Sequence, residues 1–224
     1  MKVEPIRDKK DIKRIEDKLF AINTPKGNRM FVMFEVGIYL GMRIGDMLEL
    51  RVGDIRGKEG YSFMPQKTDE RKKDGKPDPK YRPKKVYLTI PPELRSVVKH
   101  MYSDQPDNAP LFPSRQHRKG QTDIMPISRK TAFMDMKEIA RIAGLNYPIG
   151  CHTLRKTFGY HVYQKNNDIA WLQTWFQHSS AATTLIYIGI ADDEKKAVTD
   201  NMPYDDRSRF DWNSKRKVCS MYDT

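Results

Sequence analysis

Apolar residues recur at helical spacing in several separate segments of the chain. Residues 8–22 form the first segment and predict an amphipathic helix, whose apolar side carries Ile12, Ile15, Leu19 and Ile22. The polar cluster 23–28 predicts a turn. Residues 29–41 are rich in Phe, Val, Met and Ile, which predicts a buried helix that ends at Gly41.

Shorter patterns complete the prediction. Further helices are expected around Arg43–Leu50, from Pro91 onward, from Ser128 to about Ala143, over residues 153–164 and over residues 191–200. Residues 61–66 and 85–90 have the composition of short strands, joined by a long basic hairpin loop over residues 67–84. Residues 104–127 are Pro-rich and irregular. The expected fold class is therefore mainly α with a small antiparallel β-sheet (α+β).

Two basic side chains lie at the start of the helix expected over residues 153–164 and just before it. His152 and Arg155 are three positions apart, which places them one helical turn apart. Leu154, Phe158 and Val162 supply the apolar spacing of the same segment. This pair is suited to hold one anion.

His178 and Tyr187 are nine positions apart. On a single straight helix they would point to nearly opposite sides, because nine steps of about 100° rotate the chain by about half a turn. They converge only if the helix breaks between them. Ser179 and Ser180 follow His178 directly, and either serine suits the cap of a new helix.

Composition points to a polyanionic partner. The 224 residues include 41 Lys+Arg and 29 Asp+Glu, a formal net charge of +12. The two cysteines, Cys151 and Cys219, form no disulfide framework, which favours a reducing, cytoplasmic compartment. The N-terminus does not have the pattern of a signal peptide, and no apolar run approaches the roughly 18 residues expected of a membrane span. No acidic cluster indicates a metal site.

Several motifs, in this order and spacing, resemble the tyrosine recombinase (phage integrase) family over roughly residues 30–190. The matching positions are Arg43 in Gly41-Met-Arg-Ile-Gly-Asp46, Lys67 before Thr68 at the end of the first strand, the pair His152-Thr-Leu-Arg155, and His178-Ser-Ser followed by Thr183-Thr184 and Tyr187. Gln177 departs from the pattern, because the family usually has glycine before this histidine. The departure concerns a local turn more than the chemistry.

The resemblance implies a site-specific recombinase that cleaves and rejoins double-stranded DNA without metal or cofactor. Tyr187 would be the nucleophile and would form a 3′-phosphotyrosyl intermediate. The other implied roles are phosphate binding by Arg43, Arg155 and His178, proton transfer assisted by His152, and protonation of the leaving oxygen by Lys67.

Two assignments keep an alternative. Asp46 lies one turn after Arg43 and either orients its guanidinium or is an ordinary acid in the first turn of a helix. Lys67 is favoured as the catalytic lysine, but several other cations follow it in the hairpin loop.

We expect residues 1–202 to form one catalytic domain and residues 203–224 a tail, either docked on a neighbouring protomer or frayed. The family implies a tetramer on DNA, accessory DNA-binding proteins, and a core-binding domain ahead of the catalytic one. Only about 25–30 residues stand there. The chain is then either a small stand-alone recombinase from a bacterium or phage or one that has lost the clamp.

Two alternatives belong to other functional classes. A DNA-binding regulator with the recombinase fold would not cut DNA, and it would have no use for Tyr187. A type IB topoisomerase would share the chemistry but relax supercoiled DNA without sequence preference.

Overall fold

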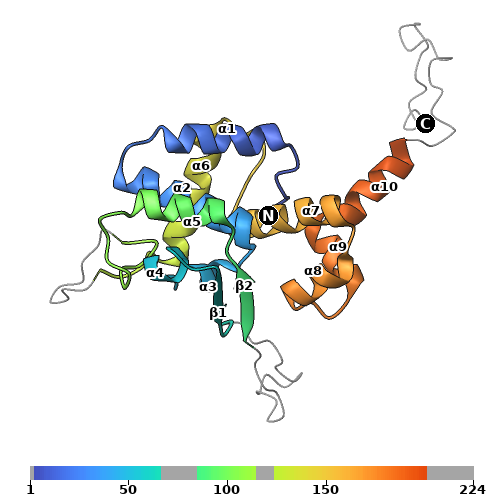
Figure 1. Ribbon diagram of the computed structural model, residues 1–224. Helices are drawn as coiled ribbons and strands as arrows, with labels where there is room; N and C mark the ends of the chain where they lie inside the picture. The colour runs from blue at the N-terminus through green and yellow to red at the C-terminus, as the bar shows by residue number, and fades with distance from the viewer. Residues whose placement is uncertain (1–2, 67–84, 115–123, 201–224) are drawn as a thin grey trace, which may run out of the picture.

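The computed structural model describes residues 3–66, 85–114 and 124–200 (Figure 1). The elements follow in the order α1 (Lys9–Phe20), α2 (Pro25–Leu40), α3 (Ile44–Met47), α4 (Val52–Ile55), β1 (Gly60–Phe63), β2 (Val86–Thr89), α5 (Pro92–Met101), α6 (Arg129–Ala143), α7 (Cys151–Asn166), α8 (Ile169–Phe176), α9 (Ala181–Ile188) and α10 (Ile190–Asp200). The predicted class, mainly α with a small antiparallel sheet, is confirmed. The hairpin loop 67–84, Cys219 and the tail 203–224 lie outside the described residues.

The first helix forms where the apolar spacing predicts it. Asp8 caps α1 by accepting a hydrogen bond from the backbone N–H of Lys10, at 2.8 Å. Ile15 and Leu19 are fully buried, and α1 packs against α2 and α6. Ile22 follows the end of the helix and still packs against the same core.

The second helix begins earlier than its predicted start at residue 29. Thr24 accepts a hydrogen bond from the N–H of Gly27 at 3.0 Å, and Pro25 occupies the first turn, where its missing N–H is no loss. The predicted turn over residues 23–28 was therefore wrong for residues 25–28, which are helical. The predicted end at Gly41 is confirmed, with φ of +58°.

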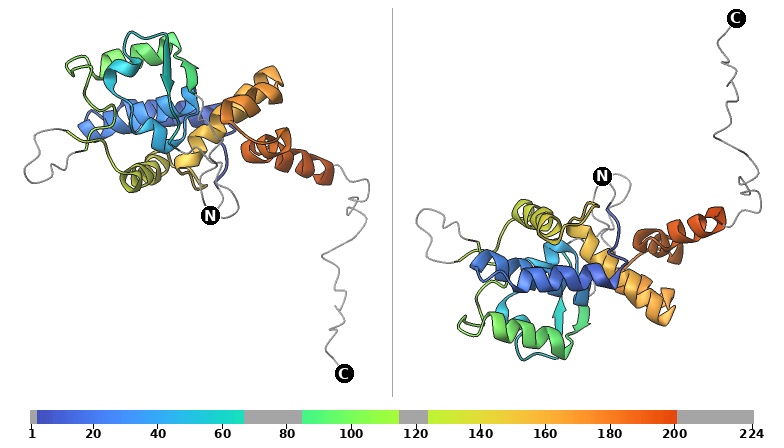
Figure 2. Two further views of the ribbon diagram at one scale, coloured as in Figure 1. Left: turned by 90° about the horizontal axis from the view of Figure 1, so that it is seen from below. Right: turned by 90° about the horizontal axis from the view of Figure 1, so that it is seen from above.

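The larger core is built around α2, which packs against α1, α5 and α7. In both views of Figure 2 the blue N-terminal helices run between the green α5 and the yellow-green α6. A side chain at Gly37 would collide with Leu154, so α7 approaches α2 closely because this residue is glycine. That approach fixes α7 against the end of α2.

A smaller apolar cluster joins α7 to the last helices. Its buried members are Phe158, Leu172, Phe176, Ile188 and Ile190. Phe158 belongs to α7, whereas the others come from α8, α9 and the start of α10. The cluster therefore holds α8 and α9 against the same helix that packs on α2.

The two strands pair in antiparallel register, from Gly60 opposite Thr89 to Phe63 opposite Val86. The predicted strand over residues 61–66 is shorter than expected, because it ends before Pro65, which cannot donate to the ladder. The strand predicted over residues 85–90 is confirmed as β2.

Two helices were not predicted. α4 is only four residues long, too short to show a period, and Asp54 supports its start by accepting from the N–H of Arg51 at 2.8 Å. α8 is apolar on nearly every side, which hides its helical period. The helices expected from Pro91, from Ser128 and over residues 191–200 are confirmed as α5, α6 and α10.

Glu35 gives the fold a testable pH dependence. Its side chain lies in α2 at 4% exposure, and its Oε1 has no hydrogen-bond partner among the described residues. Burial, together with the nearby Glu16 carboxyl, raises the pKa of Glu35 to about 8. Between about pH 5 and pH 8 the folded chain therefore holds a proton that the unfolded chain releases, and the free energy of unfolding falls as pH rises, by roughly 1.4 kcal/mol per pH unit.

We expect Glu35→Gln to remove this slope and to raise stability near neutral pH. Urea unfolding at several pH values measures it, with the exposed Glu194→Gln of α10 as the matched control. Parallel pH profiles for wild type and Glu35→Gln would show that Glu35 titrates normally in the fold.

Candidate active site

Two arginines from distant parts of the sequence meet at one carbonyl group. Arg43 stands at the N-cap of α3, and its Nη2 donates to the carbonyl oxygen of Phe176 at 3.2 Å. Arg155 is buried in α7 and donates from Nη2 to the same oxygen, also at 3.2 Å. Its Nη1 donates to the carbonyl of Gly41 at 2.6 Å. The last carbonyl of α8 therefore holds both guanidinium groups side by side.

The turn between α8 and α9 has the break that the sequence predicts. α8 ends at Gln177, whose φ of +55° is left-handed, the backbone that glycine adopts without strain. The departure from the family's glycine thus falls on a turn, as expected. Of the two candidate serines, Ser180 caps α9 by accepting from the N–H of Thr183 at 3.1 Å.

This break brings the aromatic groups together. The rings of His178 and Tyr187 have centroids 5.1 Å apart, in an edge-to-face arrangement. Nδ1 of His152 lies 3.3 Å from the hydroxyl oxygen of Tyr187. Tyr187 therefore contacts two imidazole rings, one from α7 and one from the α8–α9 turn.

The surroundings of Tyr187 act on its acidity in opposite directions. Burial raises the pKa of Tyr187, whereas the positive charges of Arg155 and Arg43 lower it, and the net effect is a raised pKa. The phenol is therefore protonated at neutral pH in the free protein.

The two arginines also act on their neighbours. Burial is the main cause that lowers the pKa of Arg155 to about 10; Tyr187 opposes this shift and the charge of Arg43 adds to it. For His178, burial and then the charges of Arg155 and Arg43 lower the pKa to about 4. The site thus has a surplus of positive charge that an anion would offset.

Five of the proposed site residues are brought together, namely Arg43, His152, Arg155, His178 and Tyr187. Lys67 lies outside the described residues. Asp46 is buried near the site, but its carboxylate accepts from the backbone N–H of Gln66 at 2.7 Å, and no described hydrogen bond joins it to Arg43. Its role in orienting Arg43 stays a prediction.

Sequence reasoning missed Lys156 and gave Thr184 no role. Lys156 follows Arg155 in α7, is 7% exposed, and places Nζ 5.4 Å from the ring centroid of Tyr187. Thr184 is fully buried, with its hydroxyl 3.0 Å from Nδ1 of His178. The sequence signal for Lys156 was weak, because a lysine in a helical pattern is normally exposed.

His161 and Tyr160, in the middle of α7, lie against the N-terminal segment. Nε2 of His161 is 2.9 Å from the carbonyl oxygen of Ile6, and Arg7 lies over the ring of Tyr160 at 5.6 Å.

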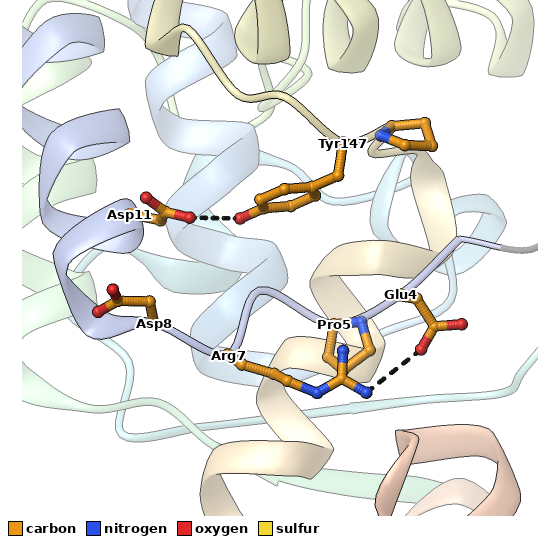
Figure 3. Close-up of a pocket in the computed structure, with 7 residues that line it drawn as sticks. Glu4, Pro5, Arg7, Asp8, Asp11 and Tyr147 are labelled. Atoms are coloured by element: carbon orange, nitrogen blue, oxygen red, sulfur yellow. Dashed lines mark hydrogen bonds and ion pairs between the residues drawn. The ribbon is translucent and has the colours of Figure 1, made fainter. Parts of the chain in front are cut away.

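A pocket of about 370 Å³ lies elsewhere, between the N-terminal segment and the loop before α7 (Figure 3). Tyr147 points across it and donates to Asp11 at 2.7 Å, and Arg7 pairs with Glu4. Glu4, Asp8 and Asp11 line this pocket beside Arg7, so its lining is more acidic than the arginine-rich site around Tyr187.

The part of the chain that the structure describes contains no group of three or more His, Cys, Asp or Glu side chains arranged to hold a metal ion. None of its helices has the length and apolar character needed to cross a membrane.

Comparison with known proteins matches the phage integrase family model to residues 8–194. The probable integrase/recombinase YoeC of Bacillus subtilis (strain 168) is 36% identical over 195 residues, covering 87% of this chain and 94% of the relative. A tyrosine recombinase of Pseudothermotoga lettingae is 29% identical over 86% of this chain, and XerA of Pyrococcus furiosus is 27% identical over 71%. The chain spans 63% and 49% of the length of these last two.

Solved structures share the fold. The crystal structure of XerA recombinase matches with a TM-score of 0.62 at 21% identity, over 91% of this chain and 67% of XerA. The catalytic domain of bacteriophage HP1 integrase matches with a TM-score of 0.52 at 16% identity, over 91% of this chain and 98% of the domain.

Neither alternative class, the non-cutting regulator or the type IB topoisomerase, gains support from these proteins. The family model matches most of the chain, and the identity to YoeC extends over most of both chains, so the family is established. The chain belongs to the phage integrase family and is a tyrosine recombinase, an enzyme of the DNA strand-transferase class.

Proposed function

We propose that this chain cleaves double-stranded DNA at a specific site and rejoins it through a covalent 3′-phosphotyrosyl link to Tyr187. The observation that carries the proposal is the placement of the Tyr187 hydroxyl 3.3 Å from His152, beside the two guanidinium groups held at Phe176. The phenolic oxygen attacks phosphorus, the bond to the 5′ oxygen breaks, and the 5′ hydroxyl leaves with a proton. Attack by a 5′ hydroxyl reverses the step and releases the tyrosine.

Arg43 and Arg155 bind the scissile phosphate in this mechanism. Each guanidinium has five N–H donors, and the bonds to Phe176 and Gly41 leave others for the non-bridging oxygens. Their charges stabilise the negative charge that builds on the phosphoryl oxygens in the transition state. An arginine at such a position is worth about 10³–10⁵ in rate.

His152 accepts the proton of the nucleophile. A base is required because the Tyr187 phenol, with its raised pKa, is protonated at neutral pH. Nδ1 of His152 lies within hydrogen-bond reach of that phenol, and the side chain is exposed, so it can exchange the proton with solvent.

Lys67 protonates the leaving 5′ oxygen. The support comes from the chain just before it: Asp46 accepts from the N–H of Gln66, and Arg129 donates to the Gln66 side chain at 2.8 Å. These bonds fix the residue before Lys67 against α3, next to Arg43. Beside its predicted role in orienting Arg43, Asp46 therefore positions Gln66, the residue before Lys67.

Lys156 positions the nucleophile. Its buried ammonium group lies over the Tyr187 ring, and a cation over an aromatic face favours the electron-rich phenolate over the phenol. In this role Lys156 stabilises the charged form of the ring during attack.

The partner is double-stranded DNA. The net charge of +12 supports this, as does the likeness to XerH, which was solved bound to its difH DNA in pre- and post-cleavage complexes. A tetramer on DNA, accessory DNA-binding proteins, one catalytic domain over residues 1–202, a docking tail over residues 203–224 and action in the cytoplasm complete the proposal.

Covalent trapping tests the proposal. The protein is mixed with sheared DNA from its source cell and denatured, and protein-linked DNA is sequenced beside a Tyr187→Phe control. We expect DNA ends at one sequence, only with wild type. Ends scattered over all sequences would favour a topoisomerase, and the absence of any adduct would favour a non-cutting binder.

Arg155→Ala should lower cleavage by about 10³-fold or more while leaving most of the DNA affinity. Since Arg155 also holds two carbonyl groups, Arg155→Lys keeps a cation and separates loss of folding from loss of chemistry. The exposed Arg141→Ala of α6 is the matched control. Wild-type cleavage by Arg155→Ala would refute the assignment.

Lys156→Met should slow covalent complex formation at saturating DNA by about tenfold and move its pH profile to higher pH, because a cation–π contact of about 1–2 kcal/mol is lost. Lys156→Arg should restore most of the rate. Lys165→Met changes an exposed lysine of the same helix and serves as control. A slower rate with an unshifted pH profile would assign Lys156 a packing role only.

A further inference from the structure

The ring of His178 is held from one side by a buried hydroxyl group. Nδ1 of His178 is 3.0 Å from Oγ1 of Thr184, in the first turn of α9. Thr184 has no exposed surface, so solvent does not compete for this hydroxyl. Nε2 of His178 has no hydrogen bond within the described ranges, and it is the ring nitrogen left to meet the DNA.

The number of hydroxyl hydrogens decides which partner donates. Oγ1 of Thr184 also lies 3.2 Å from the carbonyl oxygen of Ser180, a group that can only accept. A threonine hydroxyl has one hydrogen, and giving it to Ser180 leaves the oxygen as an acceptor for an N–H of His178. Only with a proton on Nδ1 does this buried hydroxyl both donate and accept, the arrangement that buried polar groups favour.

This arrangement limits what neutral His178 can do. With its one proton on Nδ1, Nε2 carries a lone pair and accepts hydrogen bonds. Phosphate oxygens are acceptors as well. In neutral His178 the lone pair of Nε2 would therefore face a lone pair of the phosphate oxygen, and no hydrogen bond could form. His178 donates to phosphate only when Nε2 is protonated too.

The groups that face His178 set when that second proton binds. Arg155 comes from α7, Arg43 from the segment before α3, and Tyr187 from α9, while the nearby cation Lys156 lies over Tyr187. In the free protein, burial and the two arginines lower the pKa of His178 to about 4, so the ring is neutral at pH 7. A phosphodiester adds a negative charge at this point, which opposes the effect of the two arginines and raises the pKa of His178.

We propose that Thr184 is a positioning residue which holds the proton of His178 on Nδ1, and that seating the scissile phosphate makes His178 take up one further proton on Nε2. The proton comes from solvent, and the resulting imidazolium adds its positive charge to those of Arg43 and Arg155 beside the phosphate. The second half rests on the proposed function, because it needs a phosphate at this site. The first half concerns the free protein and does not.

The tautomer is tested without DNA, by ¹⁵N NMR of the protein labelled at histidine, with His178 identified from the spectrum of His178→Gln. Protonated and unprotonated ring nitrogens resonate far apart. We expect protonated Nδ1 and unprotonated Nε2 for His178 at neutral pH, unchanged in Thr184→Ser and altered in Thr184→Val. Thr183→Val makes the same change at an exposed neighbour and should leave His178 unchanged. Among the described residues, the Thr183 hydroxyl bonds the Ser180 side chain and not His178.

A proton on Nε2 of His178 in the free protein, or the wild-type signal in folded Thr184→Val, would overturn the first half. These outcomes do not depend on whether the protein cuts DNA, so they are distinct from a failure of the proposed function.

Proton uptake is tested with Tyr187→Phe, which cannot cleave, and a duplex carrying the sequence recovered by trapping. The control duplex has an uncharged methylphosphonate at the scissile position. In the pH range where His178 is neutral in the free protein and charged in the DNA complex, the affinity for the normal duplex should fall by up to about tenfold for each unit that pH rises. The affinity for the control duplex should depend less on pH. Calorimetry in two buffers of different ionisation enthalpy should give close to one extra proton taken up with the normal duplex. Equal slopes and equal uptake for both duplexes would overturn the second half.

Discussion

The carbonyl oxygen of Phe176 accepts hydrogen bonds from both Arg43 and Arg155, and the rest of the site depends on this meeting. Hydrogen bonds from charged donors contribute about 1.5–3 kcal/mol each, which helps to hold two like charges together in a partly desolvated place. The same residue packs its ring under Arg155, with the guanidinium carbon 4.2 Å from the ring centroid. Phe176 thus holds the phosphate-binding pair through both its backbone and its side chain.

This contact is available only because α8 stops at Phe176. The left-handed residue Gln177 ends the helix, so the carbonyl of Phe176 points out of the helix end instead of continuing the helical ladder. The turn that follows carries His178, and Ser180 starts α9, which returns Tyr187 to the same place. One helix end therefore positions the phosphate-binding arginines, the second histidine and the nucleophile.

Two apolar clusters supply the rigidity that this geometry needs. The larger one fixes α7 against α2, where Gly37 lets Leu154 approach, and so sets Arg155 against Gly41. The smaller one, centred on Phe158 and Phe176, fixes α8 and α9 against α7. Since α7 contributes residues to both clusters, its buried face fixes the site relative to the larger core. The free site keeps an excess of positive charge, which is the condition under which binding a phosphate would draw a proton to His178.

The sequence by itself determined what depends on neighbours along the chain. Apolar spacing, caps and turn residues predicted the helix that ends at Gly41, the helix from Ser128 to about Ala143, the hairpin strands and the break after His178. Each of these depends on local spacing or on a local cap. Ordered motifs gave the five residues that meet in the site. Prediction from the sequence failed where a segment was too short to show a period, as at α4, or apolar on nearly every side, as at α8. It also missed the start of α2.

Only the tertiary structure decided which distant groups touch. It brought two arginines to the Phe176 carbonyl and hydrogen-bonded the Asp46 carboxylate to the backbone N–H of Gln66. It also buried Lys156 over the ring of Tyr187 and placed Thr184 beside His178. The spacing of residues in the sequence does not predict these contacts. They arise because helices separated by many residues pack at angles fixed by side-chain shape, and burial then sets the charge of each group.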